Sequence, residues 1–337
     1  MPEGAGRAGG RWPGSLGLGG TVVLVALAAL LWDAAARGWA VVPRTEVPAP
    51  GTPLESLTRE TARHITVIFW LGYLALLDGL LERVRSVRGP GGSPVRRHPG
   101  RFALCCASSI AIWLTFEWLN DASLDAWRYH GLPTDRFHLW TMYALAFATI
   151  CPALFLTAAL LLRIDALAAL DGPRVRIAPA VQLAIGAGCV LALALIEGPL
   201  GAIPAFAFWA FLLDPLNRRL GGPSIFAEWE EGRWGRTAAL CAAGLVCGLL
   251  WEGWNYLAVA KWTYHLPFLG PLEAVRLFEM PLPGYLGYPP FAIECWVMFQ
   301  TIMLIGARLA GSKRVRSPDA MLGGTGPPRA LDGSDRR

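Results

Sequence analysis

Eight long runs of apolar residues are the feature of this sequence that most constrains its fold. A helix needs roughly 20 residues to cross the hydrocarbon core of a bilayer, and a backbone surrounded by lipid must pair its own polar groups. Composition agrees, because 54% of the residues are hydrophobic and only 16% are charged. We therefore expect an all-α, polytopic membrane helix bundle. The predicted spans are 16–33, 64–82, 102–121, 138–162, 177–197, 200–217, 236–258 and 288–309.

Two of these spans carry a second signal. Residues 16–33 follow two arginines and precede several small residues, which is also the pattern of a cleaved signal peptide. We treat this segment as the first span and keep cleavage as the alternative. The span at 200–217 contains Pro204 and Pro215, but its length still suffices to cross the bilayer.

The distribution of basic residues predicts the orientation. With the N-terminus in the cytoplasm, alternation through eight spans places most of the 30 Lys and Arg residues in cytoplasmic segments. Residues 1–15 and 311–337 are rich in Gly, Pro, Arg and Ser, so we expect disordered cytoplasmic tails. The net charge of +5 follows from this asymmetry and favours anionic lipid headgroups as partners, not nucleic acid. We expect a bacterial inner membrane, and the sequence indicates no protein partner.

The seven cysteines indicate neither disulfides nor a metal site. All of them lie within predicted spans, and none forms a Cys-x-x-Cys pair. His130 and His265 lack a second histidine at helical spacing, which argues against a zinc site. We therefore predict no metal and no cofactor.

An internal repeat organises the chain. Glu117, Asn120, Trp127, Tyr129 and His130 recur 135 residues later as Glu252, Asn255, Trp262, Tyr264 and His265. Four predicted spans separate corresponding points, so both copies cross the membrane in the same direction. We predict a 4+4 parallel tandem repeat, with four-helix units at 16–163 and 164–310.

The two Glu-x-x-Asn motifs are the main candidates for chemistry. Glu252 lies in the outer third of its span, and Asn255 is three residues further on, so both side chains share one helix face. A carboxyl group within a span is costly and usually faces the bundle interior or a watery cavity. The alternative is structural, since each Glu can simply bind neighbouring helices. Glu117 and Asn120 repeat the arrangement in the first half.

A Pro- and Gly-rich segment distinguishes the second copy. Residues 278–290 are too rich in these residues for a regular helix and contain Glu279, and Glu294 follows inside the last span. We expect Glu252, Glu279 and Glu294 to converge. Carboxyl groups that are close together and desolvated resist ionising together, so one of them can serve as a general acid.

The predicted site divides into two groups of residues. The predicted catalytic residues are Glu252, Glu294, Asn255 and Glu279. The predicted substrate-binding residues are Trp251, Trp254, Trp262, Tyr264, His265, Glu117 and Asn120.

The second copy resembles lycopene-cyclase-type membrane domains, and also an uncharacterised group of bacterial multi-pass membrane proteins. Asn255, the Trp262-x-Tyr264 step and Glu294 after Pro290 occupy the places of that family's amide, aromatic and acidic motifs. The family's paired acids after the proline are reduced here to the single Glu294. The resemblance implies helical repeats and an enzyme that protonates an isoprenoid double bond without a metal.

Three hypotheses for the function follow. The first is an intramembrane enzyme that acts on a lipophilic, isoprenoid-like substrate, with Glu252 and Glu294 as acid and base. The second is a transporter or proton-coupled carrier in which the same residues bind a cation or a proton. The third is a non-catalytic scaffold in which the Glu-x-x-Asn motifs only hold helices together.

Overall fold

The computed structural model describes residues 14–44, 47–84 and 92–310. Within them the chain is helical apart from two short two-stranded ribbons. Seven helical segments are long and apolar enough to cross a membrane, by length and composition. The chain is therefore an integral, multi-pass, all-α membrane protein. The segments are Ser15–Ala36, Ile65–Arg83, Pro99–Leu124, Arg136–Leu161, Pro199–Arg219, Gly235–Tyr256 and Leu282–Leu309.

The fifth predicted span, at 177–197, differs from the other seven. Residues 177–197 were expected to cross the membrane, but the helix there, α9 (Pro179–Leu195), has only 17 residues. Beyond it the backbone turns at Gly198, whose φ is +83°, and Pro199 opens a new 3₁₀ turn. In the described ranges the count of eight thus becomes seven long segments and one shorter apolar helix. The predicted tails fall almost entirely outside the described residues.

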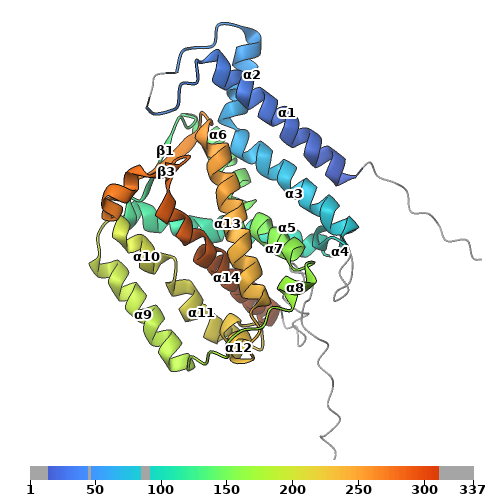
Figure 1. Cartoon of the computed structure of the whole chain (residues 1–337), viewed down its shortest axis with the longest axis vertical. Coiled ribbons are helices and arrows are strands. Elements are labelled where there is room, and N and C mark those ends of the chain that lie inside the picture. Colours follow the sequence, from blue (N-terminus) through green and yellow to red (C-terminus); the bar gives the residue numbers. More distant parts are fainter. Residues whose placement is uncertain (1–13, 45–46, 85–91, 311–337) are drawn as a thin grey trace, which may run out of the picture.

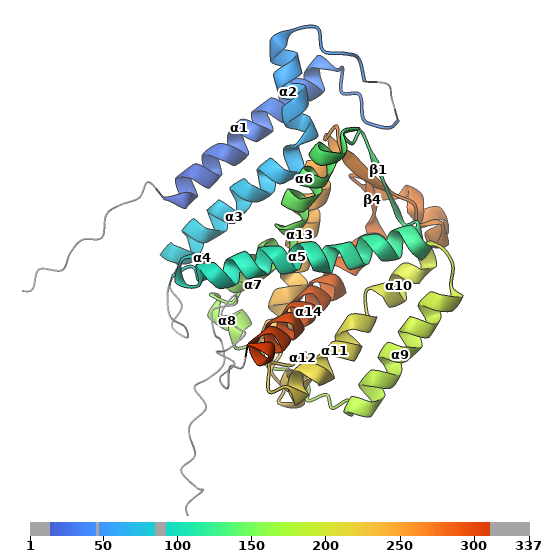
Figure 2. The same cartoon turned by 180° about the vertical axis from the view of Figure 1, so that it is seen from behind.

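Two antiparallel helix pairs form opposite ends of the molecule. Helix α1 (Ser15–Ala36) lies along α3 (Ile65–Arg83), and α9 lies along α11 (Phe208–Arg219), as Figures 1 and 2 show from both sides. Small residues allow the close approach, since a Cβ atom on Gly19 would lie 2.6 Å from the Gly72 carbonyl oxygen. Helix α2 (Pro53–Arg63) extends beyond the α1–α3 pair.

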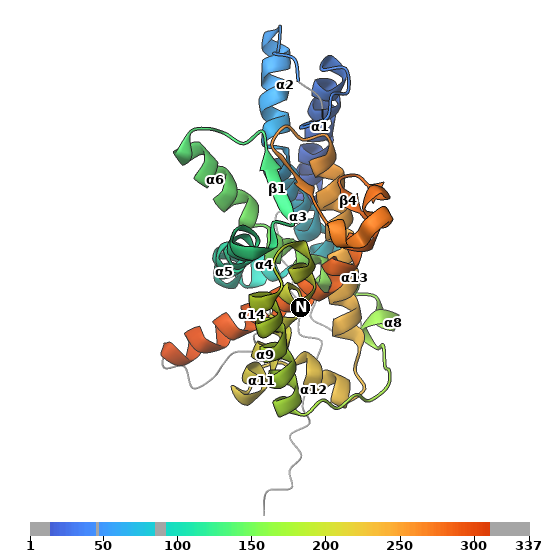
Figure 3. The ribbon, with the colours of Figure 1, turned by 90° about the vertical axis from the view of Figure 1, so that its left-hand side faces the viewer.

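The predicted span at 138–162 is broken into two helices. These are α6 (Arg136–Phe147) and α7 (Ile150–Leu161). Pro152 has no N–H for the carbonyl group of residue 148, which favours a break at this point. The Ser109 hydroxyl on α5 (Pro99–Leu119) bridges the break, since it donates to the Phe147 carbonyl and accepts from the Cys151 N–H. The break lets α6 lean away from the other helices (Figure 3).

A second break interrupts the predicted span at 200–217. The 3₁₀ turn η2 (Pro199–Gly201) and the short helix α10 (Ala202–Ala205) come first, and α11 begins at Phe208. Between them Ala207 has a φ of −139°, which is outside the helical range. The Pro-interrupted segment is thus a discontinuous helix.

Helices α13 (Gly235–Tyr256) and α14 (Tyr288–Leu309) pack against each other at the centre of the bundle (Figure 1). Between them the chain forms short strands and 3₁₀ segments, whose bounds are given below. The remaining elements are α4 (Pro94–Arg97), η1 (Asn120–Leu124), β1 (Trp127–His130), α8 (Asp165–Ala168), α12 (Ile225–Glu230), β2 (Lys261–Tyr264), η3 (Pro267–Ala274), β3 (Arg276–Leu277), β4 (Met280–Pro281) and η4 (Leu282–Gly287).

Candidate functional site

The two Glu-x-x-Asn motifs are joined through a β-ribbon. Strand β1 pairs antiparallel with β2, and the register sets Trp127 opposite Tyr264 and Tyr129 opposite Trp262. Each motif contributes an asparagine that binds the strand following it. The Asn255 side chain donates to the Trp262 carbonyl at 2.8 Å and accepts from its N–H at 2.9 Å. Asn120 makes the corresponding bonds to Trp127, at 2.9 and 3.2 Å.

Glu252 is fully buried and lies among hydrogen-bond donors. Its Oε1 atom accepts from the hydroxyl groups of Tyr264 and Tyr288, each at 2.8 Å, and from the Trp262 Nε1 at 3.3 Å. Its Oε2 atom has no hydrogen-bond partner within the described part of the chain. Burial, followed by the charge of Glu252, raises the pKa of the Tyr264 phenol well above its ordinary value. Tyr264 therefore remains a protonated donor.

Glu117 has a similar environment in the first half. The hydroxyl group of Tyr129 donates to its Oε1 at 2.5 Å, and the Nε1 of Trp113 donates to the same atom at 2.6 Å. Tyr129 occupies the position in β1 that Tyr264 occupies in β2, counted from the preceding glutamate. Glu117 is half-buried, whereas Glu252 is inaccessible.

A cavity of about 510 Å³ lies beside both carboxyl groups. Its wall contains the donors that bind them, Tyr129 and Trp113 for Glu117, and Tyr264 and Tyr288 for Glu252. The rest of the wall is mostly apolar. The other aromatic wall residues are Trp127, Tyr143, Phe147, Phe206, Trp251, Trp262, Phe268 and Phe291.

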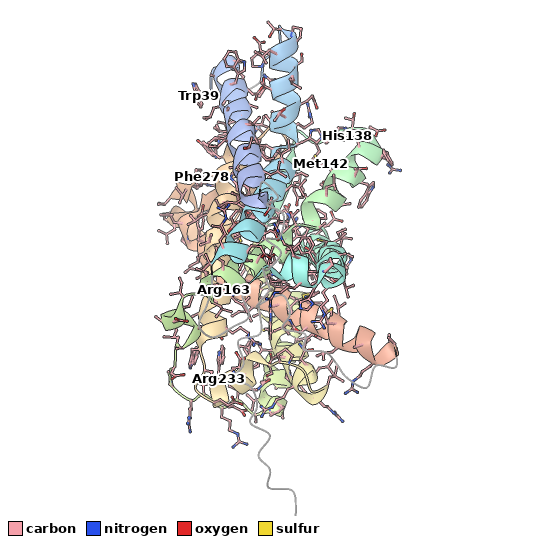
Figure 4. The ribbon with its side chains drawn as sticks, turned by 90° about the vertical axis from the view of Figure 1, so that its right-hand side faces the viewer. Trp39, His138, Met142, Arg163, Arg233 and Phe278 are labelled. Carbon is pink, nitrogen blue, oxygen red and sulfur yellow. The ribbon has the colours of Figure 1, made fainter. Side chains whose placement is uncertain are left out.

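The cavity reaches the surface of the molecule. Leu286 of η4 and Ile203 of α10 belong to its wall, yet they are 75% and 62% exposed. An apolar rim of this kind suits entry from lipid. The wall residue His64 stacks against His138, and their Nε2 atoms are 2.6 Å apart. His138 and the wall residue Met142 are on α6 (Figure 4).

Glu279 is buried and binds two cations. Its two oxygens bind the Lys261 Nζ at 2.5 Å and the Arg44 guanidinium at 2.6 Å. Lys261 also donates to the Tyr256 carbonyl at 2.7 Å. Burial lowers the pKa of the Lys261 ammonium, and Glu279 opposes that shift. A carboxyl group with two cationic partners is suited to holding the irregular segment in place, not to serving as a neutral acid.

Glu294 does not lie beside Glu252, so the three carboxyl groups do not converge as the sequence predicted. Its Oε1 accepts from the backbone N–H of Trp209 at 2.9 Å, and the Ala210 N–H is a second donor. The side chain lines a separate cavity of about 160 Å³. The physical reason is the break between α10 and α11, because that break exposes backbone N–H groups that bind the carboxyl group.

Four of the predicted substrate-binding residues lie outside the cavity wall: Trp254, His265, Glu117 and Asn120. Trp254 packs on the other side of α13, with ring centroids 4.5 Å from Trp70 and 4.9 Å from Phe69 of α3. The His265 side chain is 57% exposed and faces Glu273 at 3.4 Å. In contrast, Trp251, Trp262 and Tyr264 are wall residues.

The predicted site omitted three residues that contact the Glu117 and Glu252 carboxyl groups, namely Trp113, Tyr129 and Tyr288. Tyr129 could have been found from the repeat, since it stands at the same distance from Glu117 as Tyr264 does from Glu252. Tyr288 carries no such signal, because it approaches Glu252 from a distant helix.

Comparisons of the chain with protein-family models, with curated proteins and with solved structures find no match.

Proposed function

We propose that the protein takes a lipophilic molecule from the bilayer into the aromatic cavity and acts on it by proton transfer. The position of Glu252 carries this proposal, since this buried carboxyl group lies directly behind the wall and binds two wall phenols, Tyr264 and Tyr288. The exposed rim residues Leu286 and Ile203 give such a molecule a route from lipid.

The hydrogen bonds suit a proton relay. When Glu252 is charged, both phenols donate to it, and their oxygen lone pairs can accept from a bound molecule. When Glu252 is protonated, it donates to one phenol, whose own O–H can then turn toward the cavity. The phenol then gives its proton to the bound molecule and receives the proton of Glu252. The net transfer is therefore from Glu252 to the bound molecule. The aromatic faces of Trp251 and Trp262 favour positive charge on that molecule.

The resemblance to lycopene-cyclase-type domains suggests an isoprenoid as the substrate class. In this assignment Asn255 fixes the strand that carries Trp262 and Tyr264, and so positions the relay. Glu294 is not a partner of Glu252 in the reaction. The matched contacts of Glu117 and Asn120 support a 4+4 parallel repeat. The distribution of basic residues supports cytoplasmic termini, in what we propose is a bacterial inner membrane.

Two other functions make different predictions. A carrier would bind its cargo in the same cavity and move it across the membrane unchanged, and the discontinuous helix α10–α11 is a feature of many transporters. A scaffold would use the Glu252 hydrogen bonds only to join α13, α14 and β2.

The test compares Glu252→Gln with the matched variant Glu117→Gln. Cells expressing equal amounts of wild type or either variant are extracted, and their lipids are analysed by untargeted mass spectrometry. We expect one lipid to be depleted and another to accumulate in cells with wild type or Glu117→Gln, but not with Glu252→Gln. Identical lipid profiles for wild type and Glu252→Gln at equal expression would contradict the proposal.

A further inference from the structure

Glu294 lies at the discontinuity between α10 and α11, inside the membrane-spanning region. Its Oε1 atom accepts from the Trp209 N–H, and the Ala210 N–H also donates to the carboxyl group; both lie in the first turn of the 12-residue helix α11. The first N–H groups of a helix lack partners within the helix, and a carboxylate there is favoured by the helix dipole. Glu294 of α14 thus supplies from another helix the cap that the broken chain needs.

The second oxygen of this carboxyl group, Oε2, has a different environment from the first. Glu294 is fully buried, and its Oε2 has no hydrogen-bond partner within the described residues. The side chain lines the 160 Å³ cavity between α11, α12 and α14. A buried charged oxygen without a partner is costly, and the neutral, protonated form of the same carboxyl group avoids much of that cost.

The surroundings of Oε2 determine which ligand fits. Most of the cavity wall is apolar, and its other carboxyl group, Asp214, already accepts from the Ser224 hydroxyl and from the backbone N–H groups of Ile225 and Phe226. A metal cation needs several oxygen ligands, whereas a proton needs one.

We propose that Glu294 is an intramembrane proton-binding site, separate from the Glu252 site. Proton binding neutralises the carboxylate that caps α11 and so weakens its hold on the Trp209 and Ala210 N–H groups. Phe206 and Pro290 line both cavities, so this site adjoins the wall of the aromatic cavity. The proposal does not depend on the function proposed for Glu252.

Other titratable groups surround Glu294 from several elements. Asp214 lies on α11, Cys189 on α9, and Cys295 is next to Glu294 on α14. Cys151 of α7 and Cys105 of α5 lie beyond Cys295. On α13, Arg236 stacks over Trp296 with its guanidinium carbon 4.8 Å from the ring centroid. Thiols lose their protons only in alkaline solution, so a titration near neutral pH distinguishes Glu294 from them.

The test uses dicyclohexylcarbodiimide, an apolar reagent that enters membranes and reacts with protonated carboxyl groups. The carboxyl O–H adds across one C=N bond of the reagent, and the adduct rearranges to a stable N-acylurea without losing an atom. The full-length protein in phospholipid nanodiscs is treated between about pH 6 and pH 10, and modified peptides are mapped by mass spectrometry. The protonated fraction of a carboxyl group falls about tenfold for each pH unit above its pKa.

We expect modification at Glu294 that declines as the pH rises, persists in Glu252→Gln and Glu117→Gln, and disappears in Glu294→Gln. The wild-type map alone decides the question if Glu294→Gln does not fold. Absence of modification at Glu294, or equal modification at every pH, overturns the proposal. The lipid profiles that test the role of Glu252 do not enter this measurement, so the two proposals can fail separately.

Discussion

The hydroxyl group of Tyr288 donates to the Oε1 atom of Glu252 at 2.8 Å, and this bond joins the first turn of α14 to the end of α13. Tyr264 binds the same oxygen from β2. One carboxyl oxygen therefore fixes two helices and the ribbon around the aromatic cavity. Loss of the Tyr288 bond should therefore affect both the unfolding free energy and the proposed proton transfer, and variants can separate these two effects.

Tyr288→Phe removes one donor from Glu252 and one group of the proposed relay from the cavity wall. We expect a loss of about 1 kcal/mol in unfolding free energy, together with at least about a tenfold loss of lipid conversion. Tyr285→Phe is the control, because its hydroxyl binds the Leu277 carbonyl at 3.1 Å and not a carboxyl group. Thermal unfolding in detergent and lipid analysis give the two readouts. Equal conversion by both variants would argue against the relay.

Asn255→Ala leaves the N–H and carbonyl groups of Trp262 without their partner. Asn255 is fully buried, so we expect a loss of about 2 to 3 kcal/mol in unfolding free energy. Asn120→Ala is the matched variant and should cost less, because Asn120 is only half-buried. Denaturant unfolding measures both. A larger loss for Asn120→Ala would show that the two asparagines do not have equivalent roles.

Asp33 on α1 binds two buried arginines, Arg37 at 3.0 Å and Arg59 of α2 at 2.5 Å. Asp33→Ala leaves both cations without this partner, so we expect a loss of about 3 to 5 kcal/mol in stability. The control is Glu60→Ala, since Glu60 is 56% exposed and binds Arg63 on the surface. That variant should change stability by less than about 0.5 kcal/mol. Thermal unfolding of both variants measures the difference.

Much of the site follows from the sequence because its residues are local. Each Glu-x-x-Asn motif stands a few residues before the strand that it binds, so the recurring spacing predicts that Glu252, Asn255 and Tyr264 lie close together. The membrane-spanning segments can also be predicted from the sequence, because the length of an apolar run must match the thickness of the bilayer. The same spacing separates Glu117 from Tyr129, and the Tyr129 hydroxyl likewise donates to Glu117.

Features that depend on contacts between distant segments could not be predicted. The break at 206–207 is satisfied by Glu294, which lies more than 80 positions along the chain. The sequence also placed Trp251 and Trp254 together, whereas only Trp251 reaches the cavity. Helix α13 is surrounded by other helices, so the hydrophobic pattern does not mark which of its faces meets the cavity.

The buried Lys261 predicts a pH dependence of stability. Burial lowers its pKa below the ordinary value of 10.5, so the unfolded chain binds more protons than the folded chain between the two pKa values. Unfolding free energy should therefore rise with pH in this alkaline window, up to about the unfolded value. Lys261→Met removes the titrating group and should flatten the rise. Thermal unfolding of wild type and variant at several alkaline pH values gives the comparison, and parallel curves would exclude this contribution.

Filling the aromatic cavity should block ligand binding without unfolding the protein. Ala146 of α6 is a half-buried wall residue, so Ala146→Trp places an indole ring in the space that a ligand would occupy. Ala187→Trp introduces the same ring on the exposed face of α9, outside the wall. The probe is geranylgeraniol, an isoprenoid alcohol, and its binding to protein in nanodiscs is measured by native mass spectrometry. We expect binding at least about tenfold weaker for Ala146→Trp than for Ala187→Trp, which corresponds to about 1.4 kcal/mol. Because both variants carry the same added ring, equal binding would mean that the probe occupies some other surface and that the cavity is not its site.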